Sequence, residues 1–210
     1  MYRLNAFIWD MDGTVLDSYG AIVTSLYRAY ASFGVEIDMK EIRKEVLTTS
    51  VGAFMDNMEK RTGITYDTLE PVYHDIAVEE QERIRPIHNA PEILRFLKDR
   101  GIRSFVFTHR GLSTLYLLEK LGLNDLFEDI VTARDGFPRK PDPSAVNHLV
   151  EKHSLDRETT AYVGDRIIDV RCAVNAGIKS ILYLEADSVV KAAGMETFVI
   201  HDLINIRDLI

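Results

Sequence analysis

Short apolar runs alternate along most of the chain with segments in which apolar residues recur every three or four positions. The first run, residues 4–9, stops at Asp10, and further runs follow after residue 100. Runs of this length are typical of strands covered on both faces, and the spaced segments are typical of amphipathic helices. The predicted strands after the first are residues 102–107, 129–132, 161–163, 179–184 and 197–200.

The helices predicted between these strands have ordinary start and stop signals. Pro91 opens a helix that Gly101 closes, which is the expected order of proline first and glycine last. Strands alternating with helices indicate a parallel sheet joined by right-handed crossovers. The other predicted helices cover residues 112–121, 142–153, the segment that ends at Gly177, and the end of the chain.

The stretch from residue 17 to residue 85 has a different pattern. Apolar residues recur at helical spacing from Tyr19 until Gly34, and no strand pattern follows in the rest of the stretch. We therefore expect an all-helical insertion. Two or three more helices are predicted in it, with breaks at Gly52, Gly63 and Pro71.

These patterns predict an α/β protein. A Rossmann-like parallel sheet with helices on both faces is expected from residues 1–16 and 86–210, which form the core. The inserted all-helical segment, residues 17–85, is expected to form a separate domain.

Charge and composition narrow the class of protein. A net charge of −8 over 210 residues argues against a nucleic-acid surface, because phosphate backbones attract basic faces. The single cysteine, Cys172, has no partner for an internal disulfide, which indicates a reducing compartment. No apolar stretch approaches the ~20 residues of a membrane helix, and polar residues come too early for a signal peptide. We expect a cytoplasmic enzyme with no nucleic-acid or membrane partner.

Four short polar segments come where predicted strands end or in the loop that follows. They are residues 10–14, Thr108, Lys140, and Asp165 with Asp169. In open parallel sheets, ligands bind outside the carboxyl ends of the strands, so these side chains are expected to converge. Several carboxylates, a hydroxyl and one cation together predict a pocket for a divalent metal and a phosphoryl group.

Asp10 and Asp12 offer two complementary activities. A carboxylate at a strand end can act as a nucleophile and form an aspartyl-phosphate, although a lone aspartate more often holds a turn. A second carboxylate two residues later can protonate a leaving oxygen and then deprotonate water. Gly13 allows a sharp turn, and Thr14 is expected to hold that turn through its hydroxyl.

The remaining segments suit a metal and an anion. Mg²⁺ favours carboxylates and water, so we predict Asp165 as a direct ligand and Asp169 as a water-mediated or orienting partner. The alternative is that both only complement a helix dipole. Lys140, between restrictive prolines, can bind phosphoryl oxygens, and Thr108 can donate its hydroxyl to one. Alternatively, Lys140 is a solvated surface charge and Thr108 an ordinary strand residue.

Together these segments resemble the motifs of the haloacid dehalogenase-like (HAD) hydrolase superfamily, specifically its phosphatase branch near the phosphoglycolate phosphatases. Residues 10–18 look like the first motif and Thr108 matches the second. Residues 140–143 match the third, and Gly164-Asp165 with Asp169 match the fourth. The resemblance covers nearly the whole chain, and four motifs in order are far more specific than any one of them.

The resemblance implies a catalytic role for four residues. Asp10 would be the nucleophile and Asp12 the general acid/base. Thr108 and Lys140 would stabilise the transferring phosphoryl group and so also bind the substrate. The helical insertion would be a cap that closes over the site and shapes the choice of substrate. Such closure would need hinges near residues 16–18 and 84–87.

The same resemblance implies a magnesium site. Mg²⁺ would be held by Asp10, by the main-chain carbonyl of Asp12 and by Asp165, with Asp169 in support. The predicted cofactor is therefore Mg²⁺, and the predicted partner is a small phosphorylated metabolite. The chain is expected to be a monomer or a homodimer.

Further candidates for substrate binding depart from the family pattern or lie in the insertion. His109 and Arg110 follow Thr108 where relatives often have asparagine, and Arg166 stands where serine or threonine is common. Arg110 or Arg166 is a candidate contact for a second anionic group, and surface charge is the alternative. In the insertion the candidates are Arg43 and Thr49; the nearby Ser50 is also suited to capping the next helix.

The predicted function is a Mg²⁺-dependent phosphatase that works through an aspartyl-phosphate intermediate. A phosphomutase would share that intermediate and would release an isomer instead of phosphate. A dehalogenase has no need of Asp12, because no alkoxide leaves. A non-enzymatic phospho-acceptor domain needs neither Asp12 nor the helical insertion.

Overall fold

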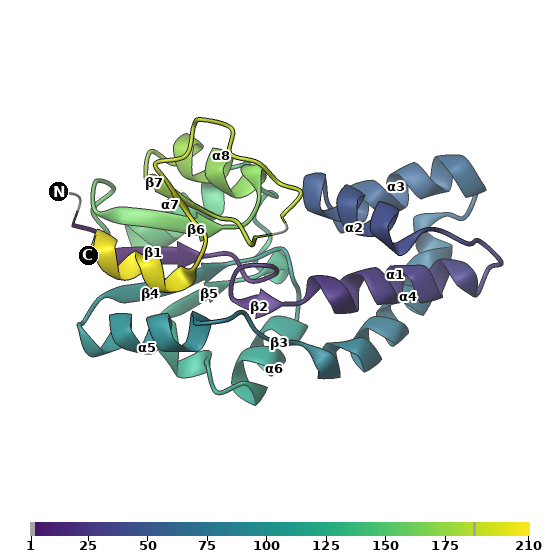
Figure 1. Ribbon diagram of the computed structural model, residues 1–210, viewed down its shortest axis with the longest axis horizontal. Helices are drawn as coiled ribbons and strands as arrows, with labels where there is room; N and C mark the ends of the chain where they lie inside the picture. Colours follow the sequence, from purple (N-terminus) through teal and green to yellow (C-terminus); the bar gives the residue numbers. More distant parts are fainter. Residues whose placement is uncertain (1–2, 187) are drawn as a thin grey trace. The chain divides into compact units, whose positions relative to one another are not determined.

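The structure is a computed structural model that describes residues 3–186 and 188–210. Among these residues a six-stranded parallel sheet forms the centre of the core, in the order β5-β4-β1-β6-β7-β8 (Figure 1). The first strand is therefore flanked by strands from much later in the chain. The strands are β1 (Ala6–Trp9), β4 (Arg103–Phe107), β5 (Asp129–Val131), β6 (Thr160–Gly164), β7 (Lys179–Tyr183) and β8 (Phe198–Ile200).

Helices cover both faces of this sheet. On one face, α7 (Ser144–Lys152) and α8 (Ile167–Asn175) pack with buried strand residues such as Ile8 and Phe105. On the other face, α5 (Ala90–Asp99) contacts β4 and the C-terminal 3₁₀ helix η4 (Leu203–Leu209) (Figure 1). The predicted α/β fold with a Rossmann-like sheet is confirmed. The remaining elements here are α6 (Ser113–Lys120), η2 (Asn124–Leu126) and η3 (Ala133–Asp135).

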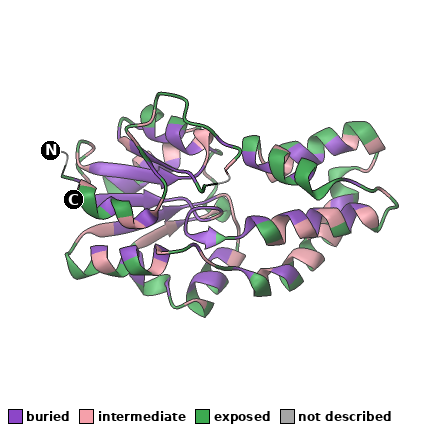
Figure 2. Cartoon of the chain, in the orientation of Figure 1, coloured by how far each residue is buried: buried purple, intermediate pink, exposed green. Residues whose placement is uncertain are grey.

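Burial explains why the apolar runs form the central strands. Every residue of β1 and β6 is buried, as Figure 2 shows by colour. Trp9, at the end of β1, has no exposed surface, and its indole N–H donates a hydrogen bond to Ser104 Oγ at 3.3 Å. A strand covered on both faces gains free energy from apolar side chains at every position, so its sequence is continuously apolar. Trp9 is a core residue, as expected.

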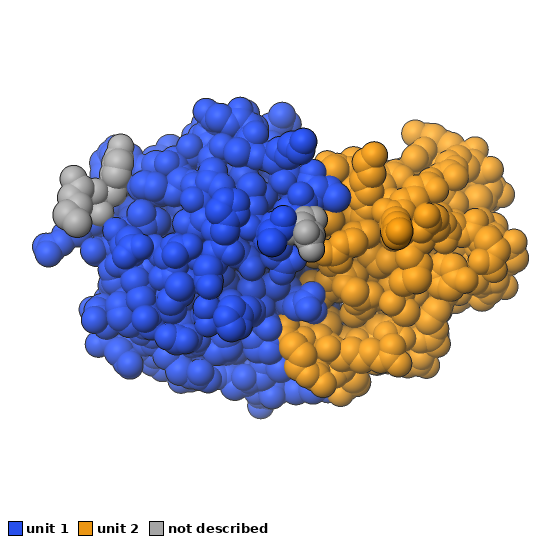
Figure 3. Space-filling model, in the orientation of Figure 1, with its two compact units in different colours: residues 1–17, 86–210 blue, residues 18–85 orange. Residues whose placement is uncertain are grey.

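The chain divides into two compact units, residues 1–17 with 86–210 and residues 18–85 (Figure 3). The sequence placed the corresponding boundaries after residues 16 and 85, and the role of the smaller unit as a cap stays a prediction. Over the described residues, no helix has the length and apolar character needed to cross a bilayer. The smaller unit contains α1 (Tyr19–Ala31), α2 (Met39–Thr48), α3 (Val51–Thr62), α4 (Tyr66–Glu80) and η1 (Gln81–Arg83).

Two of the helix breaks predicted in the smaller unit are wrong. Gly52 lies in the first turn of α3, because the Ser50 hydroxyl accepts a hydrogen bond from Ala53 N–H at 3.1 Å and caps the helix there. Pro71 lies inside α4. A proline in a helix interior costs about 3 kcal/mol, since it has no N–H and crowds the preceding turn. Packing of α4 along α1 outweighs that cost. Gly63 does end α3, with φ of 76°.

A second sheet of two very short strands was not predicted. It pairs β2 (Leu16–Asp17) with β3 (Arg85–Pro86), and next to it Ile87 N–H donates to Val15 O at 2.9 Å. Strands of two residues leave no periodic pattern in a sequence. They lie where the chain passes between the two units.

Candidate active site

Strand register brings three predicted site residues to one edge of the sheet. Trp9, the last residue of β1, pairs with residues of β4 and β6 that come two positions before Thr108 and Asp165. Asp10 directly follows Trp9, so it lies between those two neighbours at the carboxyl edge. Asp10, Thr108 and Asp165 are all buried. The convergence expected for these three residues is present.

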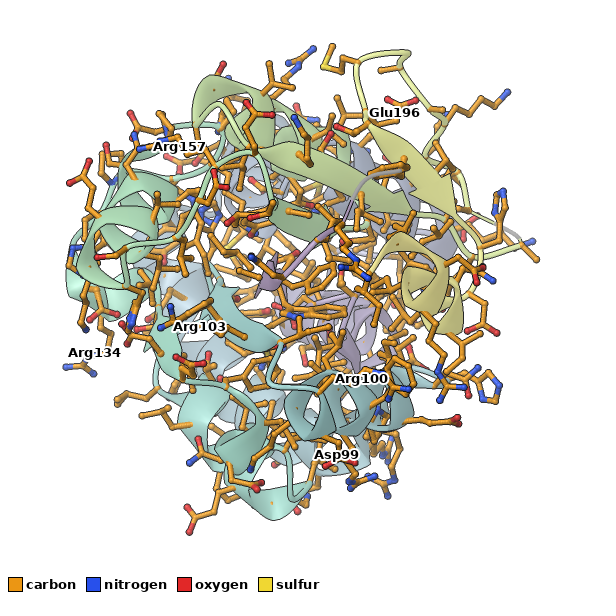
Figure 4. The ribbon with its side chains drawn as sticks, turned by 90° about the vertical axis from the view of Figure 1, so that its left-hand side faces the viewer. Asp99, Arg100, Arg103, Arg134, Arg157 and Glu196 are labelled. Atoms are coloured by element: carbon orange, nitrogen blue, oxygen red, sulfur yellow. The ribbon has the colours of Figure 1, made fainter. Side chains whose placement is uncertain are left out.

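Figure 4 faces the opposite, amino edge of the sheet. Arg103 begins β4 there, and Asp99 and Arg100 come at the end of the preceding helix. The Arg103 guanidinium pairs with Glu128 at 2.7 Å. None of the predicted site residues of the core belongs to this edge, so the candidate chemistry is confined to the carboxyl edge.

Gly164, the last residue of β6, makes room for Asp169. A Cβ atom added at Gly164 would lie 2.4 Å from Asp169 Cβ, closer than non-bonded carbons approach. The Asp169 carboxylate turns back over its own helix start, where Oδ2 accepts a hydrogen bond from Arg166 N–H at 3.1 Å. Glycine at this position therefore lets Asp169 lie against the end of the strand.

Gly164→Ala is expected to destabilise the protein by about 1–3 kcal/mol, because the added methyl group must displace Asp169. Urea unfolding followed by circular dichroism measures the loss. Gly111→Ala is the matched control, since a Cβ there has no heavy atom within 4 Å. Equal stability of the two variants would contradict the close approach.

Lys140 is a buried cation between two buried carboxylates. Its ammonium donates hydrogen bonds to Asp10 Oδ1 at 2.6 Å and to Asp169 Oδ1 at 2.8 Å. The Lys140 side chain has 0% exposure, and the rings of Phe107 and Tyr162 lie 5.2 and 5.1 Å from its nitrogen. A buried ammonium is tolerable only with such partners. The alternative of a solvated surface lysine is therefore wrong.

Hydrogen bonds on both sides hold the segment around Lys140. Lys140 N–H donates to His109 Nε2 at 2.8 Å, and the side-chain amide of Asn175 donates to Pro141 O at 2.9 Å. Burial, together with nearby cations, lowers the pKa of His109 to about 3, so the ring is neutral and Nε2 accepts. His109 thus fixes the main chain of Lys140, and its predicted contact with substrate stays a prediction.

Burial and neighbouring charges have opposite effects on the pKa values of Asp10, Lys140 and Asp169. Burial raises the pKa of Asp10 above its ordinary value, although Lys140 opposes that shift. Burial also acts to raise the pKa of Asp169, but Lys140 and Arg166 outweigh it and the pKa is lowered. Burial disfavours the charged form of Lys140, yet the two carboxylates outweigh it and raise the Lys140 pKa. These pKa directions favour a charged ammonium on Lys140 paired with a charged carboxylate on Asp169.

Three carboxylates at this edge form a cluster that fits a divalent cation. One oxygen from each of Asp10, Asp165 and Asp169 lies within 4.8 Å of the others. Asp10 Oδ2 is buried and accepts no hydrogen bond from the described residues. A buried carboxylate oxygen is stabilised by a cation, and Mg²⁺ prefers oxygen ligands of this kind. Both Asp169 oxygens already accept hydrogen bonds, which favours an orienting role for it.

Arg166 also faces this cluster, and its expected contact with a second anionic group stays a prediction. Its Nη2 lies 3.6 Å from Asp10 Oδ2, and its Nε lies 3.9 Å from Asp165 Oδ1 and 4.0 Å from Asp169 Oδ2. In the part of the chain that the structure describes, two cations, Arg166 and Lys140, pair with these three carboxylates. The cluster keeps a net negative charge, which suits a bound cation.

The Asp12 carboxylate is held by Arg110 and is not part of the acidic cluster. Arg110 donates from Nη2 to Asp12 Oδ1 at 2.7 Å and from Nε to the same oxygen at 3.0 Å. The Arg110 main-chain N–H donates to Thr108 Oγ1 at 3.1 Å. Because that oxygen accepts, the hydroxyl proton of Thr108 is available for another acceptor. The Asp12 carbonyl as a metal ligand stays a prediction.

The prediction that Thr14 holds its turn through its hydroxyl is wrong. The Thr14 hydroxyl donates to Asp165 Oδ1 at 3.4 Å, and the residue is fully buried. The turn is held by the main chain, where Leu16 N–H donates to Met11 O at 2.8 Å. Gly13 adopts φ of 82°, as the turn requires. The partner of Thr14 is 151 positions away, and no local pattern could reveal it.

Arg43 and Thr49 belong to the smaller unit. The Arg43 guanidinium carbon lies 5.8 Å from the centre of the Tyr19 ring. The Thr49 hydroxyl donates to Glu45 O at 2.7 Å at the end of α2. Both side chains are exposed, and their contact with a substrate stays a prediction.

Comparison with models of known protein families agrees with this fold. The model of the haloacid dehalogenase-like hydrolases matches residues 7–183, which include the strand ends and loops described above. The chain belongs to the haloacid dehalogenase-like hydrolase family.

Curated relatives of known name match most of the chain. A phosphoglycolate phosphatase of Agrobacterium fabrum is 32% identical over 186 residues, covering 83% of this chain and 78% of the relative. A putative pyrophosphatase of Caldanaerobacter subterraneus is 27% identical over 184 residues, covering 85% and 81%.

Solved structures share the fold. A predicted phosphoglycolate phosphatase from Haemophilus somnus superposes with a TM-score of 0.84 at 20% identity, over 100% of this chain and 99% of that one. A putative haloacid dehalogenase-like hydrolase from Bacteroides fragilis gives a TM-score of 0.80 at 22% identity, over 97% and 100%. At this identity the likeness concerns the fold alone.

Proposed function

We propose that this chain is a Mg²⁺-dependent phosphatase that hydrolyses a small phosphorylated metabolite through an aspartyl-phosphate on Asp10. The observation that carries the proposal is the state of the Asp10 carboxylate. Lys140 binds one oxygen at 2.6 Å, and the other is buried without a hydrogen bond from the described residues. An oxygen oriented in this way can attack phosphorus. Family membership and relatives named phosphoglycolate phosphatase and pyrophosphatase support it.

The proposed reaction has two steps at one phosphorus atom. In the first, one carboxylate oxygen of Asp10 forms a bond to phosphorus while the bond to the leaving oxygen breaks, and Asp12 gives that oxygen a proton. In the second, water attacks the same phosphorus, Asp12 takes its proton, and the bond between Asp10 and phosphorus breaks. Phosphate and the free carboxylate result. Lys140 and the Thr108 hydroxyl donate hydrogen bonds to the phosphoryl oxygens.

Asp10 and Asp165 would hold the Mg²⁺ ion, and Asp169 would orient Lys140 beside it. When bound, the ion supplies positive charge that offsets the clustered carboxylates and the phosphoryl oxygens. Without compensating charge, the Asp10 carboxylate and an incoming phosphate dianion repel each other. Lys140 supplies part of that compensation.

A phosphate-release screen tests the proposed function. The purified chain with Mg²⁺ is offered phosphoglycolate, pyrophosphate, sugar phosphates and nucleoside monophosphates, with the Asp10→Asn variant as the blank. We expect release of inorganic phosphate from at least one of them well above the blank. Chromatography of the products for isomers distinguishes a phosphomutase, and an isomer without free phosphate would refute the proposal.

Removal of the metal is expected to stop phosphate release. EDTA should lower the rate to that of the blank, because uncompensated carboxylates repel the phosphate dianion, and excess Mg²⁺ should restore it. The melting temperature provides a second measurement, since a ligand that binds only the folded state raises it. Full activity in EDTA would contradict the metal requirement.

A further inference from the structure

The pairing of Arg110 with Asp12 has a consequence for the choice of substrate. Three donor–acceptor distances join the two groups: 2.7 and 3.0 Å to Asp12 Oδ1 and 3.3 Å to Oδ2. A forked guanidinium–carboxylate pair of this kind is among the strongest side-chain contacts in proteins. Both oxygens of Asp12 therefore accept from Arg110 in this structure. An Asp12 carboxyl that gives its proton to a leaving oxygen needs at least one oxygen directed at the substrate.

The pair lies where a ligand can reach it. The Asp12 and Arg110 side chains retain 20% and 13% exposure, whereas Asp10 retains 2%. Arg110 follows Thr108 by two residues, and its N–H binds the Thr108 hydroxyl oxygen. Asp12 follows Asp10 by two residues. Arg110 thus contacts two residues proposed to handle the phosphoryl group, Thr108 through its main chain and Asp12 through its guanidinium.

The Arg110 side chain has a second anchor that can keep it in place after it leaves Asp12. Its Nη1 donates to Ser113 Oγ at 3.2 Å, at the start of α6. An arginine held at its main chain and by a neutral hydroxyl keeps its charge, and the donors that bind Asp12 are also suited to another carboxylate or phosphate. Among these partners, the Asp12 carboxylate is an anion, so an anionic ligand can take its place on the guanidinium.

We propose that Arg110 selects substrates that carry a second anionic group close to the phosphoryl group, by exchanging Asp12 for that group. This inference rests on the proposed phosphatase function. Without such a ligand, Arg110 keeps Asp12 paired. A substrate carboxylate or second phosphate binds the guanidinium and releases Asp12 toward the leaving oxygen. Binding of the correct substrate therefore also completes the acid/base group, and neutral esters fail to do so.

The substrates that appear in the names of two relatives, phosphoglycolate and pyrophosphate, belong to this class. Phosphoglycolate carries a carboxylate one carbon from the ester oxygen, and pyrophosphate carries a second phosphate on the bridging oxygen. Both are short enough for the second anion to lie within a side chain's length of the reacting phosphorus. The shared feature is the second charge and not the carbon skeleton.

The test compares two esters of the same length. Phosphoglycolate and 2-hydroxyethyl phosphate differ in having a carboxylate or a neutral CH₂OH at the same carbon. With the wild-type chain and Mg²⁺, we expect kcat/KM for phosphoglycolate to exceed that for 2-hydroxyethyl phosphate by about 10- to 100-fold, as one charged hydrogen-bonded contact permits.

The Arg110→Gln substitution is expected to reduce the difference in kcat/KM between phosphoglycolate and 2-hydroxyethyl phosphate. KM for phosphoglycolate should rise, and kcat for 2-hydroxyethyl phosphate should increase several-fold because Asp12 is no longer paired. Arg110→Lys should fall between the wild type and Arg110→Gln, since an ammonium keeps the charge and loses the fork. Arg95→Gln removes an exposed arginine of α5 and is the matched control.

The outcomes separate this inference from the proposed function. Equal kcat/KM for the two esters in the wild type would overturn the role of Arg110 and leave the phosphatase intact. An equal fall in kcat for both esters in Arg110→Gln, with an unchanged melting temperature, would mean that Arg110 only positions Asp12, and would also overturn it. If Arg110→Gln does not fold, the kcat/KM values of Arg110→Lys for the two esters decide the question. No phosphate release from any ester would refute the proposed function, and this inference with it.

Discussion

Replacing Asp10 by asparagine is expected to lower the rate of phosphate release by at least about 10³-fold while the chain stays folded. The amide lacks the anionic oxygen that attacks phosphorus, but its carbonyl oxygen can still accept the hydrogen bond from Lys140. The fold should persist because Lys140 keeps Asp169 as its charged partner at 2.8 Å. Phosphate release and circular dichroism measure the two effects.

The covalent intermediate gives this prediction a more direct measurement. Acid quenching of the wild-type chain during turnover, followed by mass spectrometry, should show a phosphorylated peptide that contains Asp10. The Asp10→Asn variant should show none. Asp208→Asn, at an exposed carboxylate near the chain end, is the matched control and should behave as the wild type. Phosphate release by Asp10→Asn above a tenth of the wild-type rate would contradict the nucleophile.

Replacing Lys140 by methionine is expected to cost about 3–5 kcal/mol of stability as well as nearly all activity. Methionine keeps the length and the apolar stem but leaves Asp10 and Asp169 without their shared cation. Both carboxylates are buried, with 2% and 1% side-chain exposure, so water cannot compensate. Urea unfolding measures the loss, and Lys191→Met, at an exposed lysine, is the control.

A double substitution separates the charge from the packing. Asp10→Asn combined with Lys140→Met removes one charge of each sign, so it should be less destabilised than the sum of the two single variants. Mg²⁺ should also raise the melting temperature of Lys140→Met more than that of the wild type, because an added cation replaces the missing one. Additive losses, with no extra effect of Mg²⁺, would show that the buried pair is not coupled.

Much of this architecture could be predicted from the sequence because strand ends carry local signals. The apolar run before Asp10 is continuous since β1 is covered on both faces, and parallel pairing then fixes where Asp10, Thr108 and Asp165 come. Lys140 required a further step, because its loop returns to the sheet edge from beyond β5. The rule that loops at the carboxyl edge of a parallel sheet converge supplied that step.

The parts that escaped prediction depend on which partner a side chain selects in space. Thr14 binds Asp165, and His109 binds the main chain of Lys140, across separations that no periodicity records. The pairing of Arg110 with Asp12, 98 positions away, was also not predicted, and the expected contact of Arg110 with a substrate anion stays a prediction. Pro71 was expected to end a helix, and packing of α4 against α1 overrides that local preference. In each case a long-range contact outweighs a short-range rule.

The pairing of β2 with β3 bears on how readily the smaller unit can change in length or sequence during evolution. Leu16–Asp17 and Arg85–Pro86 lie side by side, so the inserted polypeptide leaves the core and re-enters it at adjacent points. An insertion whose ends already meet imposes little extra closure entropy, whatever its length. Evolution can therefore lengthen, shorten or exchange that segment while the strand ends that carry Asp10 and Lys140 keep their register.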